Sequence, residues 1–236
     1  MIIQGRNAIE ELLKSNSTTI EKILIAKGGG NESLVTKIKQ SGAKYQFVDR
    51  LALDKSANSK GHQGFIAYIS DYRYYGLDEI LEKKNGNEIV LLLDGIEDPH
   101  NLGNIIRTAE CMGVHAIIIP KNRSTTVTET VIKVSAGATA HMRVCKVTNI
   151  NSTLETLKDH GFWTYACELG GTNIAKENFN GKVAIVIGGE HSGVRHQTKK
   201  NVDVVVSIPM HGKTNSLNAA TATAMILYEV NRQRGG

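Results

Sequence analysis

Apolar runs that alternate with helical patterns restrict the fold of this chain more than any other feature. From residue 89 onward, the expected strands are Ile89–Leu93, Ala116–Ile119, Arg143–Val147, Trp163–Ala166, Val183–Ile187 and Val204–Ile208. Helices are expected between them at Leu102–Met112, Glu129–Ser135, Thr153–His160 and Ser216–Arg232. Apolar strands that alternate with helices are typical of a parallel sheet covered by helices on both faces. The fold class is therefore α/β.

The N-terminal third predicts a second, smaller α/β unit. Asn7 with Glu10 has the pattern of a capping box, and Asn31 is placed to cap the helix that follows it. Short strands are expected at Lys22–Ala26, Tyr45–Val48 and Phe65–Ile69. We therefore predict a small domain over residues 1–70, a linker over 71–88 and a larger domain over 89–236.

Positive charge is concentrated in the small unit. The 236 residues contain 28 Lys and Arg against 23 Asp and Glu, and residues 1–70 alone hold 10 against 6. This excess favours an anionic partner such as nucleic acid, although a solvated lysine-rich surface explains the charge equally well. Aromatic and basic residues also alternate in segment 71–76, where an interdomain contact is favoured over stacking on nucleic acid.

Several classes of protein are excluded. Three scattered cysteines without CxxC spacing argue against a disulfide framework or a structural zinc site, and the dispersed histidines do not predict a metal site. Neither a signal peptide nor an apolar run long enough to cross a bilayer is present. We therefore expect a cytoplasmic protein without a metal or a membrane partner.

Three polar segments follow strands of the expected parallel sheet. The first, Asp94–Ala109, comes after the strand that ends at Leu93 and contains Asn101 and Arg107. Ligands of open α/β sheets bind at the carboxyl ends of the strands. From local sequence alone, Asn101 is alternatively a helix cap, and for Arg107 a plain surface residue is the favoured interpretation.

The other two segments contain closely spaced glycines and small residues. In the second, strand 183–187 runs into Gly188, Gly189 and Glu190, where glycine lets a ligand approach the backbone. The third runs from Ile208, Pro209 and Met210 through a polar loop to Ser216, Leu217 and Asn218 and a tract of small residues. Ser216 is alternatively a plain helix N-cap.

Together, and in this order, the three segments resemble the motifs of the SpoU, or TrmH-like, RNA ribose 2'-O-methyltransferases. The matching stretches are N-L-G-N-I-I-R-T-A, V-I-G-G-E-H-S-G-V and I-P-M-H-G-K-T-N-S-L-N-A-A-T-A-T-A. The N-terminal unit, which ends in H-Q-G-F-I-A, resembles the L30-like RNA-binding domain of the family. The resemblance implies a SPOUT domain with a C-terminal trefoil knot, S-adenosylmethionine as cofactor, and a homodimer whose active site lies near the subunit interface.

The resemblance also assigns site residues. The cofactor loops would comprise Gly188, Gly189, Glu190, Ile208, Pro209, Met210, Ser216, Leu217 and Asn218. Candidate catalytic residues are Arg107, Asn101, Glu190, Ser216 and Asn218. Arg107 matches the residue held to activate the ribose hydroxyl, but a guanidinium remains protonated and is a poor base. We favour stabilisation of the developing alkoxide, with general-base action as the alternative.

The implied reaction is methylation of a guanosine ribose 2'-hydroxyl in large-subunit rRNA. Candidate phosphate contacts in the N-terminal unit are Lys22, Lys27, Arg50 and Lys60. The alternatives are a related tRNA methyltransferase, an rRNA methyltransferase that confers antibiotic resistance, and a non-catalytic RNA-binding protein of ribosome assembly. No DNA partner is expected.

Overall fold

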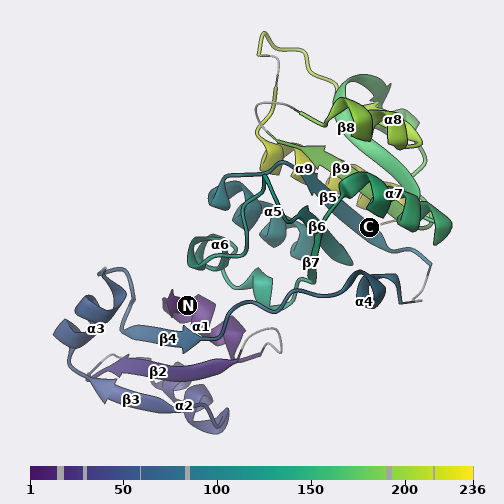
Figure 1. Ribbon diagram of the computed structural model, residues 1–236. Coiled ribbons are helices and arrows are strands. Elements are labelled where there is room, and N and C mark those ends of the chain that lie inside the picture. Colours follow the sequence, from purple (N-terminus) through teal and green to yellow (C-terminus); the bar gives the residue numbers. More distant parts are fainter. Residues whose placement is uncertain are drawn as a thin grey trace. The chain divides into compact units, whose positions relative to one another are not determined.

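The computed structural model describes residues 1–14, 19–28, 31–58, 60–82, 86–189, 193–214 and 216–235. The chain divides into two compact units (Figure 1). Unit 1 comprises residues 1–73 and 126–141, and unit 2 comprises residues 74–125 and 142–236. Within the described residues, no helix combines the length and apolar character needed to cross a bilayer.

Unit 1 contains a mixed sheet of four strands in the order β1-β4-β2-β3. β1 (Ile2–Gln4) and β2 (Ile20–Ala26) pair antiparallel with β4 (Phe65–Ile69), whereas the edge strand β3 (Tyr45–Val48) pairs parallel with β2. The helices of this region are α1 (Arg6–Leu12), α2 (Glu32–Gln40) and α3 (Arg50–Ala57). Leu53 of α3 packs with Leu24, Ala26 and Ile66, so α3 covers one face of the sheet.

Of the two helix caps expected in this unit, the structure confirms one. Asn31 caps α2 as expected, because its side chain accepts a hydrogen bond from the Leu34 N–H. The capping box at Asn7 is wrong: the N-cap of α1 is Gly5, two residues earlier, which has a φ of 101° and makes no side-chain hydrogen bond. Glycine adopts this backbone conformation without the steric cost that other residues incur.

The H-Q-G segment forms a rigid turn before β4. His62 is fully buried, its Nε2 lies 2.8 Å from Asp54 Oδ1, and its Nδ1 accepts a hydrogen bond from the Gly64 N–H. Since Nδ1 accepts, the proton of a neutral ring resides on Nε2, facing the carboxylate. The buried imidazole thereby fixes the turn that contains Gln63, whose φ is 51°.

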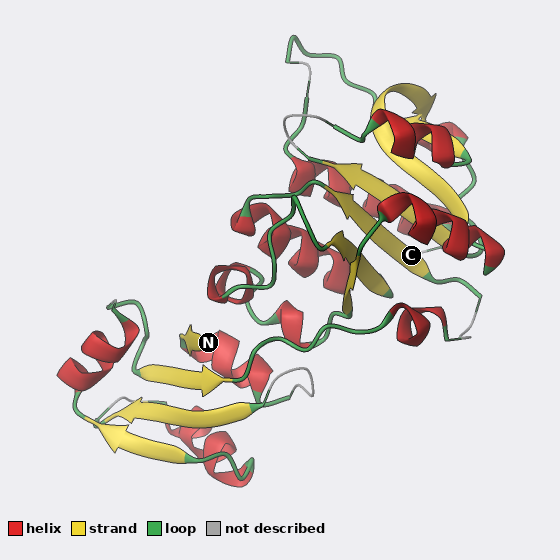
Figure 2. Ribbon diagram, viewed as in Figure 1, coloured by secondary structure: helices red, strands yellow, loops and turns green. Residues whose placement is uncertain are grey.

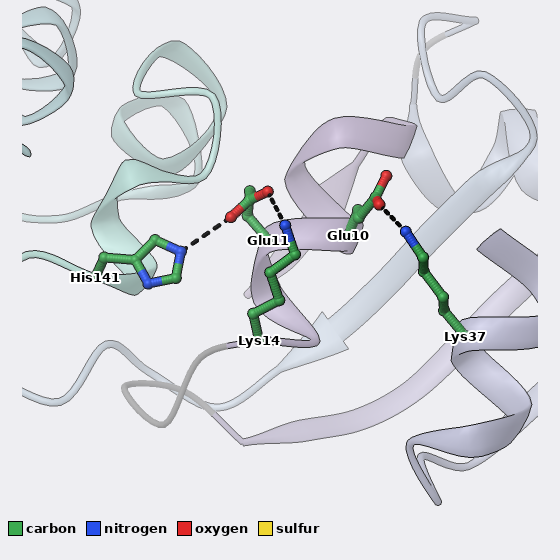
Figure 3. Close-up of polar contacts among 5 residues, drawn as sticks. All are labelled: Glu10, Glu11, Lys14, Lys37 and His141. Atoms are coloured by element: carbon green, nitrogen blue, oxygen red, sulfur yellow. Dashed lines mark hydrogen bonds and ion pairs between the residues drawn. The ribbon is translucent and has the colours of Figure 1, made fainter. Parts of the chain in front are cut away.

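Residues 126–141 of unit 1 contribute α6 (Glu129–Val134) and the short 3₁₀ helix η1 (Ala138–Ala140). Figure 3 shows Glu11 of α1 between Lys14 and His141. Its carboxylate lies 2.7 Å from Lys14 Nζ and 2.9 Å from His141 Nε2. Lys14 and His141 together lower the pKa of Glu11. The same figure shows the ion pair between Glu10 and Lys37, which joins α1 to α2.

Unit 2 contains a six-stranded parallel sheet in the order β10-β8-β9-β5-β6-β7, which confirms the expected fold class. Its strands are β5 (Ile89–Asp94), β6 (Ala116–Pro120), β7 (Val144–Val147), β8 (Trp163–Asn173), β9 (Val183–Gly188) and β10 (Val204–Ser207). Every residue of β5 and β6 is buried, as a sheet with two covered faces requires. The knot implied by the family resemblance stays a prediction.

Helices cover both faces of this sheet (Figure 2). The helices are α4 (Leu77–Leu81), α5 (Pro99–Cys111), α7 (Ile150–Asp159), α8 (His196–Asn201) and α9 (Ala219–Gln233), with the 3₁₀ helix η2 (Ile174–Lys176). α7 and α8 lie in front of the sheet and α5 and α9 behind it (Figure 1). Buried residues of α7 pack against β5 and β9 in one apolar core.

Segment 71–88, expected as a linker, contains ordered structure. The Lys146 ammonium lies 3.9 Å from the centre of the Tyr74 ring, and the Arg143 guanidinium lies 5.9 Å from that of Tyr75. Tyr75 also donates its N–H to the Val144 carbonyl beside β7. These two rings therefore contact cations of the protein itself.

Candidate active site

A pocket lies at the carboxyl edge of the larger sheet, where β8, β9 and β10 end. Its lining is mostly apolar side chains and glycine backbone: Cys167, Glu168, Leu169, Ile187, Gly188, Gly189, Gly193, Ile208, Met210, Ser216, Leu217, Ala219 and Ala222. Parallel strands present their carboxyl ends at one edge, which is where α/β sheets bind ligands. Six of the nine expected cofactor-binding residues line this pocket.

A break in the β8 ladder forms one wall. Val205 of β10 pairs with Ala166, but the next residue, Val206, pairs with Thr172. Residues 167–171 therefore have no partner in β10, and the first three of them line the pocket. A Cβ at Gly171 would collide with the Val205 carbonyl, so the close return of β8 to β10 requires glycine there.

Glycine backbone forms the opposite wall. A Cβ at Gly188 would collide with the backbone of Gly193, and a Cβ at Gly189 would collide with the Gly95 carbonyl. Gly189 donates its N–H to the Asp94 carbonyl, and Gly193 donates to the Gly189 carbonyl. The two glycines that the sequence singled out thus allow close contacts between chain segments and also face the pocket.

Asp94 supports this wall from behind. Its carboxylate is buried at the end of β5, pairs with the Arg195 guanidinium at 2.9 Å, and accepts a hydrogen bond from the Thr198 hydroxyl. The contacts join the end of β5 to α8. Sequence reasoning did not assign Asp94 a role, although a carboxylate directly after a buried apolar strand is an available signal.

Glu168 places a carboxylate on the pocket wall. It is the one acidic or basic side chain among the described lining residues. Its Oε2 accepts a hydrogen bond from the Val194 N–H at 2.8 Å and lies 4.0 Å from Lys199 Nζ, while Oε1 accepts from the Leu169 N–H. The carboxylate can attract a cationic ligand group and also holds the backbone after Gly193.

Asn218 and Asn101 connect the third polar segment to the first. Asn218 caps α9 by accepting hydrogen bonds from the N–H groups of Ala220 and Thr221, and its Nδ2 donates to Asn101 Oδ1 at 2.9 Å. Asn101 is buried in the first turn of α5. The interpretation of Asn101 and Ser216 as plain helix caps is therefore wrong. Asp98 caps α5 in place of Asn101, and Asn218 caps α9 in place of Ser216.

The remaining expected residues occupy different positions. Arg107 is exposed on α5, two turns beyond Asn101, and its guanidinium makes no hydrogen bond or ion pair with another described residue. Pro209 lines an adjacent apolar hollow with Met225 and Tyr228 of α9, while Ile208 borders both spaces. Glu190 lies outside the described residues.

Burial changes the chemistry of the one thiol in the pocket. Desolvation, together with the nearby Glu168 carboxylate, raises the pKa of Cys167 to about 11. The thiol is therefore neutral at physiological pH and acts as a small apolar group. Among the described residues, no cluster of three or more His, Cys, Asp or Glu could hold a metal ion.

Sequence reasoning missed the contribution of β8 to the pocket. Cys167, Glu168 and Leu169 line it, yet the expected strand ended at Ala166. The pair Gly170-Gly171 after that strand was an available signal, because paired glycines often mark a bulge or a close backbone approach. The composition of the lining suits a partly apolar ligand that carries positive charge.

Two family models match the chain. Residues 88–228 match the SpoU rRNA Methylase family, and residues 2–75 match the domain described as RNA 2'-O ribose methyltransferase substrate binding. The first match covers more than half of the chain and includes every residue that lines the pocket.

Individual proteins show the same similarity over their full length. The chain is 40% identical to a protein of Staphylococcus haemolyticus described as a TrmH family tRNA/rRNA methyltransferase, covering 99% of this chain and 96% of that protein. A Bacillus subtilis protein with the same family description is 39% identical over 98% and 94% of the two chains. The crystal structure of the SpoU methyltransferase AviRb from Streptomyces viridochromogenes, in complex with AdoMet, shares the fold with a TM-score of 0.85 at 21% identity, covering 100% and 91%.

Proposed function

Because this chain belongs to the SpoU rRNA methylase family, it is an RNA 2'-O-methyltransferase, and we propose that it methylates a guanosine ribose of large-subunit rRNA with S-adenosylmethionine. The observation that carries the proposal is the single pocket that collects residues from β8, the second segment and the third segment. The proposal adds to family membership the identity of the methyl donor, the target nucleoside and the role of each residue.

The residues of the pocket fit the donor. Ile187, Ile208 and Leu217 offer apolar surface to the adenine ring, and the backbone at Gly188 can hydrogen-bond to its polar edge. Glu168 places a negative charge on the wall, complementary to the sulfonium and ammonium groups of the donor. When bound, the donor supplies an activated methyl group, which moves to the ribose oxygen as the carbon–sulfur bond breaks and the hydroxyl proton is released.

The residues of the chain align the nucleophile and stabilise its charge. We assign Arg107 to the ribose 2'-oxygen and the adjacent phosphate, where a guanidinium stabilises negative charge that develops as the proton leaves. Asn101, bonded to Asn218, fixes the start of α5 against the pocket loops and so positions the helix that carries Arg107. Ser216, which lines the pocket, adds a hydroxyl to the proposed site. Glu190 is assigned to the site by its place in the second motif alone.

Partner assignments follow the same proposal. Exposed Arg107 suits a site completed by RNA and by a second protomer, which is why we propose a homodimer. Unit 1 captures RNA, in keeping with its positive charge and with the match of residues 2–75 to a substrate-binding domain. The appended unit 1 favours rRNA over tRNA as the target, because a standalone tRNA enzyme does not need a separate substrate-binding domain.

Mapping of ribose methylation tests the substrate. rRNA and tRNA from cells with and without the gene are compared, and we expect one large-subunit rRNA guanosine to lose its 2'-O-methyl group. Loss of a tRNA methyl group instead would identify a tRNA enzyme. If the purified chain binds RNA but calorimetry detects no binding of S-adenosylmethionine, the protein is a non-catalytic RNA-binding protein.

A further inference from the structure

The edge strand of unit 1 displays two aromatic rings to solvent. Tyr45 and Phe47 of β3 are 41% and 42% exposed, whereas the other aromatic side chains of unit 1, Phe65, Tyr68 and Tyr72, are buried or partly buried. Leu51, just beyond the strand, is 75% exposed. In the described part of unit 1, the exposed large hydrophobic side chains therefore all lie within residues 45–51.

The two rings share one face of the sheet. Tyr45 pairs with Ile23 and Phe47 pairs with Ile25, so the rings extend the face formed by these isoleucines onto the edge strand β3. Their centroids lie 5.9 Å apart with an interplanar angle of 85°, an edge-to-face contact that holds each ring against the other. Tyr45 and Phe47, called here the aromatic pair, thus form a small ordered apolar surface.

The surroundings of the aromatic pair are charged. Lys44 precedes β3 and Arg50 follows it, and both are exposed. Lys27 lies nearby, where its Nζ pairs with Asp49 at 3.1 Å. Unit 1 as a whole has a formal charge of +4. Exposed rings beside cations are the combination that binds single-stranded nucleic acid, since rings stack on bases while cations neutralise phosphates.

The spacing of the aromatic pair favours unpaired bases. Residues two apart on a strand are separated by about 7 Å. Bases stacked in a duplex rise by only about 3.4 Å per step. The ring centroids, 5.9 Å apart, are separated by more than one such step. The two rings therefore match bases that have been splayed apart, which a regular helix does not offer.

We propose that Tyr45 and Phe47 form a stacking site for unpaired RNA bases, by which unit 1 selects single-stranded or looped segments. This inference rests on the proposed function, because it concerns how that RNA is captured. It adds a binding site in unit 1 that is distinct from the methyl-donor pocket of unit 2, and it names unpaired bases as the ligand.

The test uses the full chain and a fluorescein-labelled single-stranded RNA of mixed sequence, with anisotropy as the readout. The double variant Y45L/F47L retains apolar side chains but lacks rings. We expect its affinity for the single strand to fall about tenfold or more, with an unchanged dependence on salt because the phosphate contacts persist. The matched control L51A, which removes a more exposed apolar side chain from the same unit, and the ring-preserving Y45F should bind like the wild type.

Other outcomes overturn the proposal. Unchanged single-strand affinity in Y45L/F47L would overturn it, as would an equal loss of affinity for a fully paired duplex of the same sequence. A change from dimer to monomer in the double variant, measured by light scattering, would instead assign the aromatic pair to contact with a second copy. Photocrosslinking of 5-bromouridine RNA to the wild type needs no variant, and we expect the crosslink within residues 44–51.

The outcome for the aromatic pair is separable from that of the proposed function. Calorimetry should show that Y45L/F47L binds S-adenosylmethionine with wild-type affinity, since unit 2 forms the donor pocket. If the wild type itself does not bind the donor, the methylation proposal fails while the stacking site can still be confirmed. If the wild type methylates RNA and Y45L/F47L captures it normally, only the stacking site fails.

Discussion

Asn218 Nδ2 and Asn101 Oδ1, which belong to residues 117 positions apart, form a 2.9 Å hydrogen bond that joins the starts of α9 and α5. The same Asn218 side chain caps α9 through its Oδ1. One amide therefore stabilises a helix terminus and connects the two segments that we assign to the donor and to the nucleophile.

Replacement of Asn218 by alanine should affect both stability and donor binding. The loss of the cap is expected to lower the free energy of unfolding by about 1 kcal/mol, and the loss of the Asn101 contact should weaken binding of S-adenosylmethionine. The control is Asn149, which caps α7 by accepting the Asn151 N–H. N149A should lower stability similarly in urea unfolding but leave donor binding unchanged. If N218A and N149A bound the donor equally well, the Asn218–Asn101 hydrogen bond would have no part in donor binding.

Arg107→Ala should separate catalysis from donor binding. Removal of one group that stabilises transition-state charge typically lowers kcat about 100-fold or more. The exposed side chain makes no described contact that the fold requires, so thermal stability should not change. Single-turnover methylation measures the rate and calorimetry measures donor affinity. A parallel loss of donor affinity would show that Arg107 supports the pocket instead.

Glu168→Gln should weaken S-adenosylmethionine binding more than S-adenosylhomocysteine binding. Glutamine can still accept the Val194 N–H, so the wall keeps its shape, but the negative charge is lost. A partly exposed ion pair contributes up to about 1 kcal/mol, so we expect about a fivefold loss for the sulfonium donor. The neutral sulfur of the homocysteine compound should be little affected. Equal losses for both compounds would show that Glu168 does not act on the sulfonium, and acts instead on the ammonium group that both compounds carry or on the shape of the wall.

Alkylation should distinguish the three cysteines. Cys111 is exposed, whereas burial raises the pKa of Cys145 and of Cys167 to about 11. Because the thiolate is the reactive form, iodoacetamide at pH 8 should modify Cys111 first, as followed by peptide mass spectrometry. Saturating donor should slow modification of Cys167 further and leave Cys111 unaffected. Rapid, donor-independent alkylation of Cys167 would argue against a donor in this pocket.

Glu229 should stabilise the fold except at low pH. Its carboxylate accepts hydrogen bonds from Arg232 and Gln233, and these lower its pKa from the usual 4.5 to about 2. The folded state therefore binds the proton less tightly than the unfolded state, and this contribution is present above pH 4.5 and is lost as the pH falls toward 2. E229Q should remove that part of the pH dependence in chemical unfolding, while E155Q, an exposed control, should not.

Buried strands could be predicted from sequence because burial on both faces produces uninterrupted apolar runs. β4 has the expected bounds, and β5, β6 and β9 each extend one residue beyond them. The exposed edge strand β3 also has its expected bounds, and there the signal was its aromatic and β-branched residues. α3 was missed because Leu53 is its one fully buried side chain, so the helix has little periodic signal. The second half of β8 was missed because it forms only by pairing with β10 across a register break.

In the site, too, features with a local sequence signal could be predicted and features formed by long-range contacts could not. Gly188, Ile208 and Leu217 could be found because their motifs are local in sequence. Glu168 could not, since its partner Val194 lies 26 residues away and beyond another strand. Contacts between Asn218 and Asn101 have the same long-range origin. Local patterns therefore predicted the loops, whereas their connections required the folded chain.

At Gly188 and Gly189 the backbone of one segment packs directly against the backbone of another. This contact limits which residues of the pocket can be changed to accept other donors. Any larger residue at either position meets backbone atoms that cannot rotate away. Analogues with a bulkier transferable group must therefore be accommodated by shortening the larger side chains of the lining, at Leu169, Met210 or Leu217. Laboratory evolution toward such analogues should accumulate its changes at those three positions and leave the glycines untouched.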